Sequence, residues 1–155
     1  MLSVDIAMEH IMFSIYRIVP AAVLAVGVGA MLSQAALAAK SEVFSGTFRA
    51  EHGTKSVPSG EVRATLNPDT NVLTYRIIWK GLSGPVNAAH FHGPASYDQD
   101  ADVMVPVDGP YKSPLSGKVT LDSEQAKELT DGMVYLNLHT EACPNGEARA
   151  QMGRR

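Results

Sequence analysis

The residues from Glu42 onward alternate between apolar and polar side chains, and this period of two limits the possible folds more than any other feature. Successive side chains of a β-strand point to opposite faces, so alternation is typical of strands with one buried face. The clearest run spans 73–80. Seven further runs are separated by turns rich in proline, glycine and asparagine: 43–50, 62–66, 86–92, 103–107, 115–121, 133–139 and 147–152.

About eight short strands with turn signals between them predict an all-β fold, an antiparallel Greek-key-like β-sandwich. One segment breaks the alternation. Ser123 is a capping residue, Ala126 and Leu129 are three residues apart, and Gly132 follows as a stop signal. We therefore expect one short connecting helix over 123–129.

The first 38 residues differ from the rest of the chain. Arg17 precedes a nearly continuous apolar run over 18–32, and the small residues Ala36-Leu37-Ala38 follow. This build is typical of a secretory signal peptide and too short for a confident membrane span. We expect cleavage after Ala38, which leaves 39–155 as one exported domain, periplasmic or extracellular, with no stable membrane span. The alternative is an uncleaved N-terminal anchor.

The charge and cysteine content of 39–155 exclude some classes of protein. Twelve Lys and Arg stand against fourteen Asp and Glu, without a basic stripe or an acidic tail, which argues against a nucleic-acid partner. Cys143 is the only cysteine, so the domain has no internal disulfide and must rely on its core or on a bound ion. We expect Cys143 to be a half-buried thiol in a turn; an intermolecular disulfide and a metal ligand are the alternatives.

Two histidines flank Phe91 in the 86–92 run, just before Gly93-Pro94. If Phe91 points into the core, alternation turns both His90 and His92 to the polar face. The same parity places His139 on the polar face of 133–139. A hairpin centred on Pro144-Asn145-Gly146 then brings the last strand alongside it.

Three imidazoles on one polar face predict a metal site, since residues two apart on a strand can converge on one ion. Neutral imidazole suits copper and zinc. The expected ligands are His90, His92 and His139, with Glu147, Arg149 and Tyr135 as supporting groups. The alternative is a structural cluster in which the histidines bond carbonyls that the Gly-Pro turn leaves unpaired, beside an ordinary Glu147–Arg149 ion pair.

Five stretches of the sequence resemble the CHRD domain, a family named from chordin and found mostly in exported bacterial proteins. The similarity runs from about Val43 to Met152. Ala150 departs from the pattern, where the family usually has glycine, and Cys143 is not part of it. The stretches are Gly60 at the start of a strand, Leu73-Thr74-Tyr75 with Gly81-Leu82, Ala88 to Ala95, Tyr135 to Thr140, and Gly146 to Gln151.

The resemblance implies a binding module and not an enzyme, because no catalytic activity is established for the family as a whole. A loose similarity to copper-zinc superoxide dismutase does not extend to function: that enzyme needs more histidines and a bridging aspartate. We therefore expect an exported, non-enzymatic module that binds copper or zinc. The alternative is an interaction domain for another exported protein, with structural histidines. A three-histidine hydrolase lacks an acid or base with independent support.

Overall fold

A computed structural model of the chain describes residues 40–51 and 53–155. The expected signal peptide, with Arg17 and the cleavage point after Ala38, lies outside these residues, as does His52. None of the helices in the described part is both long and apolar enough to span a bilayer.

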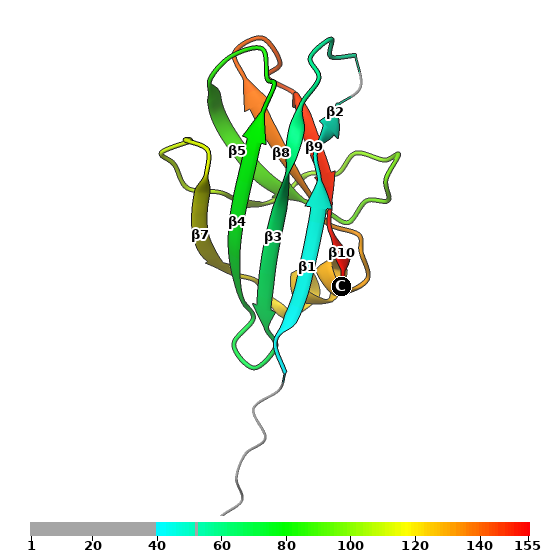
Figure 1. Cartoon of the computed structure of the whole chain (residues 1–155). Coiled ribbons are helices and arrows are strands. Elements are labelled where there is room, and N and C mark those ends of the chain that lie inside the picture. Colours follow the sequence, from blue (N-terminus) through cyan, green and yellow to red (C-terminus); the bar gives the residue numbers. More distant parts are fainter. Residues whose placement is uncertain (1–39, 52) are drawn as a thin grey trace, which may run out of the picture. The chain divides into compact units, whose positions relative to one another are not determined.

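The described chain forms two antiparallel five-stranded sheets packed face to face, which confirms the predicted all-β sandwich (Figure 1). Sheet A has the order β10-β1-β3-β4-β7 and sheet B the order β2-β9-β8-β5-β6. The strands of sheet A are β1 (Glu42–Thr47), β3 (Ser59–Asn67), β4 (Val72–Lys80), β7 (Leu115–Thr120) and β10 (Gly153–Arg154). Those of sheet B are β2 (Arg49–Ala50), β5 (Val86–His92), β6 (Val103–Pro106), β8 (Tyr135–Thr140) and β9 (Ala148–Gln151).

The first predicted strand, 43–50, is in fact two strands that belong to different sheets. β1 pairs with β3 in sheet A, and β2 pairs with β9 in sheet B, with the buried Phe48 between them. The chain can change sheets here because Gly46 lets β1 approach β9 closely. A Cβ atom at position 46 would lie 2.5 Å from the backbone oxygen of Gln151.

The predicted connecting helix is present as α1 (Ser123–Thr130), and its cap lies one residue earlier than expected. The Asp122 side chain, not Ser123, accepts hydrogen bonds from the backbone N–H groups of Glu124 and Gln125, both at 2.9 Å. The Gln125 side chain accepts in return from the Asp122 N–H at 3.0 Å, which completes a capping box. Ala126 and Leu129 are buried, as their spacing predicted.

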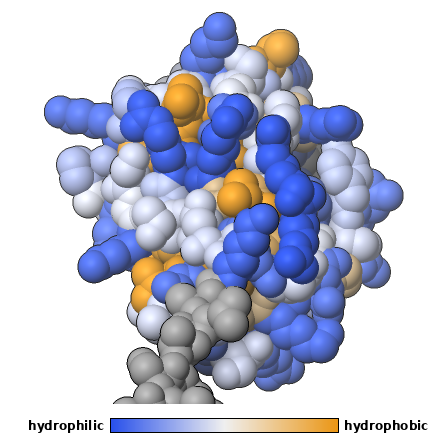
Figure 2. Space-filling model, turned by 60° about the horizontal axis from the view of Figure 1, so that its bottom comes forward, coloured by the Kyte–Doolittle hydropathy of each residue, from blue (hydrophilic) through white to orange (hydrophobic). Residues whose placement is uncertain are grey.

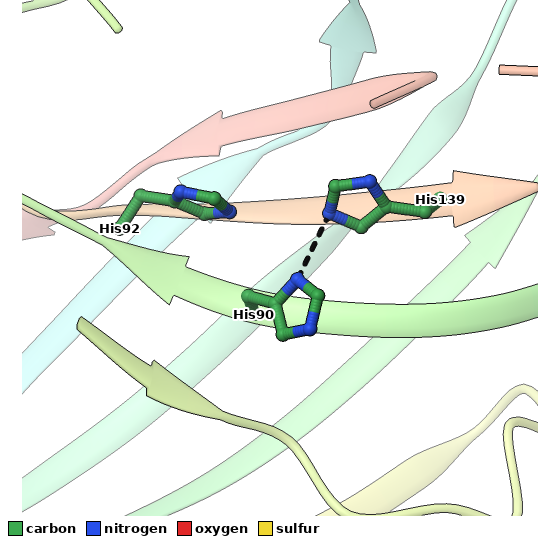
Figure 3. Close-up of side chains that lie close together, drawn as sticks. All are labelled: His90, His92 and His139. Carbon is green, nitrogen blue, oxygen red and sulfur yellow. Dashed lines mark hydrogen bonds between the residues drawn. The ribbon is translucent and has the colours of Figure 1, made fainter. Parts of the chain in front are cut away.

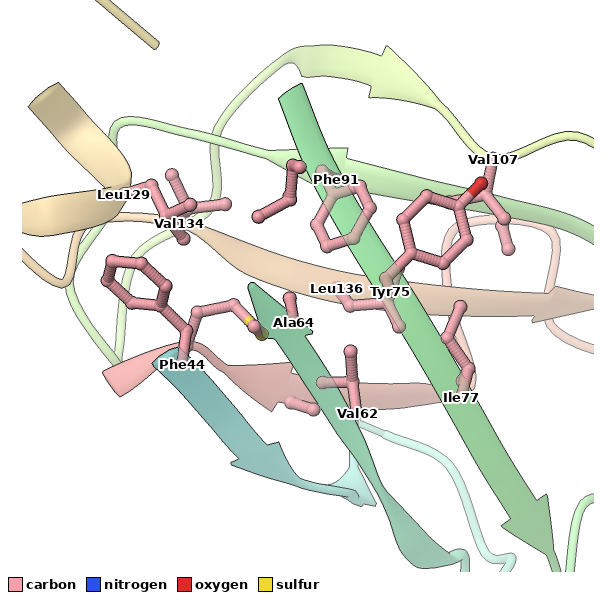
Figure 4. Packing of buried hydrophobic residues seen from close by; sticks show 14 of the residues in the cluster. Phe44, Val62, Ala64, Tyr75, Ile77, Phe91, Val107, Leu129, Val134 and Leu136 are labelled. Carbon is pink, nitrogen blue, oxygen red and sulfur yellow. The ribbon is translucent and has the colours of Figure 1, made fainter. Parts of the chain in front are cut away.

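The core between the sheets is built from the inward side chains of both (Figure 4). Phe91 of β5 is 1% exposed and meets Tyr75 of β4 edge to face, with ring centroids 5.5 Å apart. Leu136 and Leu138 of β8 are fully buried beside it. The inward orientation of Phe91 turns its two neighbours, His90 and His92, to the outer face of sheet B.

Replacing Phe91 by alanine should lower the free energy of unfolding by about 3–5 kcal/mol, because it removes an aromatic ring from a packed core and leaves a cavity. Urea unfolding followed by circular dichroism measures the effect. Thr74→Ala, on the exposed face of β4, is the control and should change stability by less than about 0.5 kcal/mol. Similar losses for the two variants would contradict this account of the core.

Candidate metal centre

The three predicted histidines come together on the outer face of sheet B (Figure 3). His92 lies opposite Tyr135 in the register of β5 and β8, and His139 lies opposite Ala88. The rings of His92 and His139 point toward each other. Between them lies the cross-strand pair of His90 and Asn137. The ring centroids of His90 and His139 are 4.8 Å apart, and those of His92 and His139 are 6.0 Å apart. One ring nitrogen from each residue lies within 4.8 Å of the others.

Backbone carbonyls orient two of the rings. Nδ1 of His139 is 2.9 Å from the carbonyl oxygen of Pro144, in the β8–β9 hairpin. Nδ1 of His92 is 3.0 Å from the carbonyl oxygen of Ala101. A carbonyl can only accept, so both Nδ1 atoms carry the proton, and each neutral ring keeps a lone pair on Nε2. Metal-ligating histidines are commonly held by carbonyls in this way.

His90 and His139 are already at nearly the separation that a shared ion requires. Nδ1 of His90 lies 3.1 Å from Nε2 of His139 and donates to it, because that Nε2 has no proton. Two nitrogens that each bind one tetrahedral ion at 2.0–2.1 Å are about 3.3 Å apart. An ion at this point would replace the shared proton, and His92 would need to move inward, because the three nitrogens now span up to 4.8 Å.

Residues 93–102 cross the outer face of sheet B, and we call this segment the strap. Arg149 holds it by donating to the carbonyl oxygens of Ser96 and Gln99, both at 2.8 Å. The Arg149 guanidinium also lies 3.5 Å from the centre of the Tyr135 ring. Tyr135 in turn stacks on His92 at 4.9 Å with the planes 7° apart. Arg149 and Tyr135 therefore lie beside His92, and their supporting role stays a prediction.

Two of the three histidines, His92 and His139, are buried although they lie on the polar face of the sheet, and His90 is half-buried. His92 is only 8% exposed. Every residue of β8 is buried, so this strand is covered on both faces. Burial lowers the pKa of His90, and the nearby rings of His139 and His92 lower it further. Burial is also the main cause that lowers the pKa of His92, opposed in part by the Ala101 carbonyl. Both rings are thus biased toward the neutral form that binds metals.

Glu147, the third expected supporting group, does not join the histidines. Its carboxylate accepts hydrogen bonds from the backbone N–H and hydroxyl of Ser83, at 2.6 and 2.8 Å, and from the hydroxyl of Thr140. Burial alone would raise the pKa of Glu147, but hydrogen bonds from these groups and from Ser56 lower it. The alternative Glu147–Arg149 ion pair does not form either, since Arg149 lies 3.5 Å from Asp100.

The carboxylate beside the centre belongs instead to Glu51, which the sequence did not single out. Nδ2 of Asn137 donates to it at 2.9 Å, and its charge acts to raise the pKa of His92. Only the pairing of β2 with β9 brings Glu51 to this face, and no local pattern signals that pairing. Cys143 is half-buried in the hairpin turn, as predicted, with its sulfur 3.9 Å from the Thr54 hydroxyl and apart from the three histidines.

Within residues 40–51 and 53–155, three buried side-chain polar atoms have no hydrogen-bond partner: His92 Nε2, Asn137 Oδ1 and Arg149 Nε. All three lie on the outer face of sheet B, within the same group of neighbouring side chains. Buried polar groups are nearly always paired, so orphaned atoms gathered in one place indicate a site for a ligand or water.

Nitrogen-15 NMR of the metal-free protein at pH 7.5 should show the Nδ1–H tautomer for His92 and His139, because only that tautomer can donate to Ala101 and Pro144. Long-range correlations between ring nitrogens and ring protons distinguish the two tautomers. An Nε2–H tautomer at either residue would show that the carbonyls do not orient that ring.

Metal-free protein should be less stable toward urea at pH 5.5 than at pH 7.5. The unfolded chain takes up protons at histidine below a pKa of about 6.5, whereas the lowered pKa values of His90 and His92 make the folded chain take them up only at lower pH. This contribution to stability is complete above pH 6.5 and is lost as the pH falls toward the folded pKa values. The double variant His90→Gln/His92→Gln should lose less stability across this range; an equal loss would contradict the assignment.

The comparisons with known proteins agree with the resemblance read from the histidine motifs. The family model of the CHRD domain matches residues 33–152, well over half of the chain and including all three histidines. No curated protein and no solved structure matches the chain. On this match, the chain belongs to the CHRD domain family.

Proposed function

We propose that this protein is an exported, non-enzymatic module that binds a copper(II) or zinc ion through His90 Nδ1, His92 Nε2 and His139 Nε2. The observation that carries the proposal is the lone pair of His92 Nε2, which is buried, directed at the other two rings and without a partner. Export follows from the leader expected over residues 1–38.

A hydrogen-bonded structural cluster explains only part of this arrangement. It accounts for the bonds to Ala101 and Pro144 and for the contact between His90 and His139. It leaves His92 Nε2 as an unsatisfied buried acceptor, which costs about 1–3 kcal/mol. An ion would use that lone pair, and the two carbonyl bonds would hold its ligands in place.

The donor set favours copper or zinc. Three neutral imidazoles supply borderline nitrogen ligands; copper(II) stands highest in affinity for such sites, and imidazole also suits zinc. Three protein ligands also leave at least one position on the ion for water or another molecule. We assign binding and not catalysis because the nearby Glu51 carboxylate is already engaged by Asn137.

A hundredfold excess of copper(II) or zinc over Kd should raise the melting temperature by about 10 °C at pH 7.5, since an ion that binds only the folded state adds about 2.7 kcal/mol. The shift should shrink as the pH falls from 6.5 to 5, where protons compete for the ring nitrogens. Differential scanning fluorimetry of protein without a histidine tag measures it, and His90→Ala, His92→Ala and His139→Ala should each abolish most of it.

Two matched variants distinguish binding at a defined site from nonspecific metal binding by other side chains. His52→Ala, which removes the one other histidine of 39–155, and Cys143→Ser should both keep the full shift. NMR gives a second readout: zinc should move the proton of His90 from Nδ1 to Nε2. If the three alanine variants melt well below wild type without metal, and no ion shifts wild type, the histidines serve the fold and the proposal is wrong.

A further inference from the structure

The outer face of sheet A carries basic side chains that no other described element covers. Figure 1 shows β1, β3 and β4 side by side with nothing in front of them. We call this the basic face; its basic side chains are Arg63 on β3, Arg76 and Lys80 on β4, Lys118 on β7, and Arg155, which lies against β1. Glu61 is its only acidic side chain among the described residues.

Three of these guanidinium groups lie in one row across the sheet. Arg63 is directly opposite Arg76 in the register of β3 and β4, and opposite Ser45 in that of β1 and β3. Nε of Arg155 donates to the Ser45 hydroxyl at 2.6 Å. Like charges on directly opposed residues destabilise a sheet. Only Arg63 is neutralised, by Glu61 at 2.7 Å.

The domain therefore separates its charges, although their total is nearly balanced. The side chains of Arg76, Lys80 and Lys118 form no ion pair or hydrogen bond with the described residues. Outside the basic face, residues 40–155 carry thirteen acidic and seven basic side chains. Composition did not indicate this basic stripe, because four separate segments of the chain contribute to it. Such a face attracts an anionic partner.

We propose that the basic face docks the domain onto a membrane surface rich in anionic lipid headgroups. Guanidinium groups bind phosphate through paired hydrogen bonds, and a flat lipid surface can meet all five basic side chains at once. Val43 and Ile78, 44% and 40% exposed, lie on the same face and add aliphatic contact.

Docking through this face would be electrostatic and shallow. Figure 2, which brings the lower end of the domain forward, shows hydrophobic residues as separate patches among hydrophilic ones. The three histidines lie on the outer face of the opposite sheet. The inference is thus independent of the metal proposal, and a docked domain would keep the metal centre turned away from the lipid.

The test measures partition of the full chain onto vesicles of equal parts phosphatidylglycerol and phosphatidylcholine, and onto pure phosphatidylcholine. The apolar run 18–32 can bind both, so the readout is the difference between them. The triple variant Arg63→Gln/Arg76→Gln/Lys118→Gln should lose roughly a hundredfold in partition onto the anionic vesicles, since each basic residue contributes about fivefold. Raising the salt to 0.5 M should have a similar effect on wild type.

The matched control, Arg49→Gln/Lys55→Gln/Lys127→Gln, makes the same change in charge away from the basic face and should lose far less. Unchanged melting temperatures would show that both variants fold. Equal losses for the two triple variants, or no preference of wild type for anionic vesicles, would overturn the proposal. Self-association that the basic-face variant abolishes, without preference for anionic vesicles, would assign the face to a second copy of the chain instead.

Discussion

The pleat of β5 is the constraint on which the rest of the molecule depends. Phe91 packs against Tyr75 from the opposite sheet, and this contact fixes which face of the strand is buried. His90 and His92, its neighbours in the strand, must then point to the opposite face. A slip of one residue in register would exchange the two faces and place two imidazoles in the apolar core. The packing that stabilises the sandwich therefore also aims the ligands of the candidate site.

Alternation along single strands was enough to predict the two-layer fold and the outward direction of all three histidines, because side-chain parity is a local property of the backbone. The same reasoning failed where distant segments meet. Glu51 reaches Asn137 across 86 positions of sequence, and Glu147 turns to Ser83 across 64. The strap bonded to Arg149 and the change of sheet at Gly46 also depend on packing that no short pattern records.

Charge shows the same division between what composition can and cannot indicate. The nearly equal numbers of acidic and basic residues give the net charge of the domain, but they do not show how the charges are distributed over its surface. Arg63 and Arg76 become neighbours only through the pairing of β3 and β4. Asp98, Asp100 and Asp102, in contrast, are exposed side chains of the strap, which is bonded to sheet B and not to sheet A.

The carbonyls that orient His92 and His139 come from connections, Ala101 from the strap and Pro144 from a hairpin, and not from the strands that carry the rings. Connections tolerate insertion and substitution better than paired strands do. Two domains with identical histidines could therefore differ in whether their rings are held ready for an ion. Lengthening either connection would change how these rings are held while leaving the paired strands of the sandwich intact.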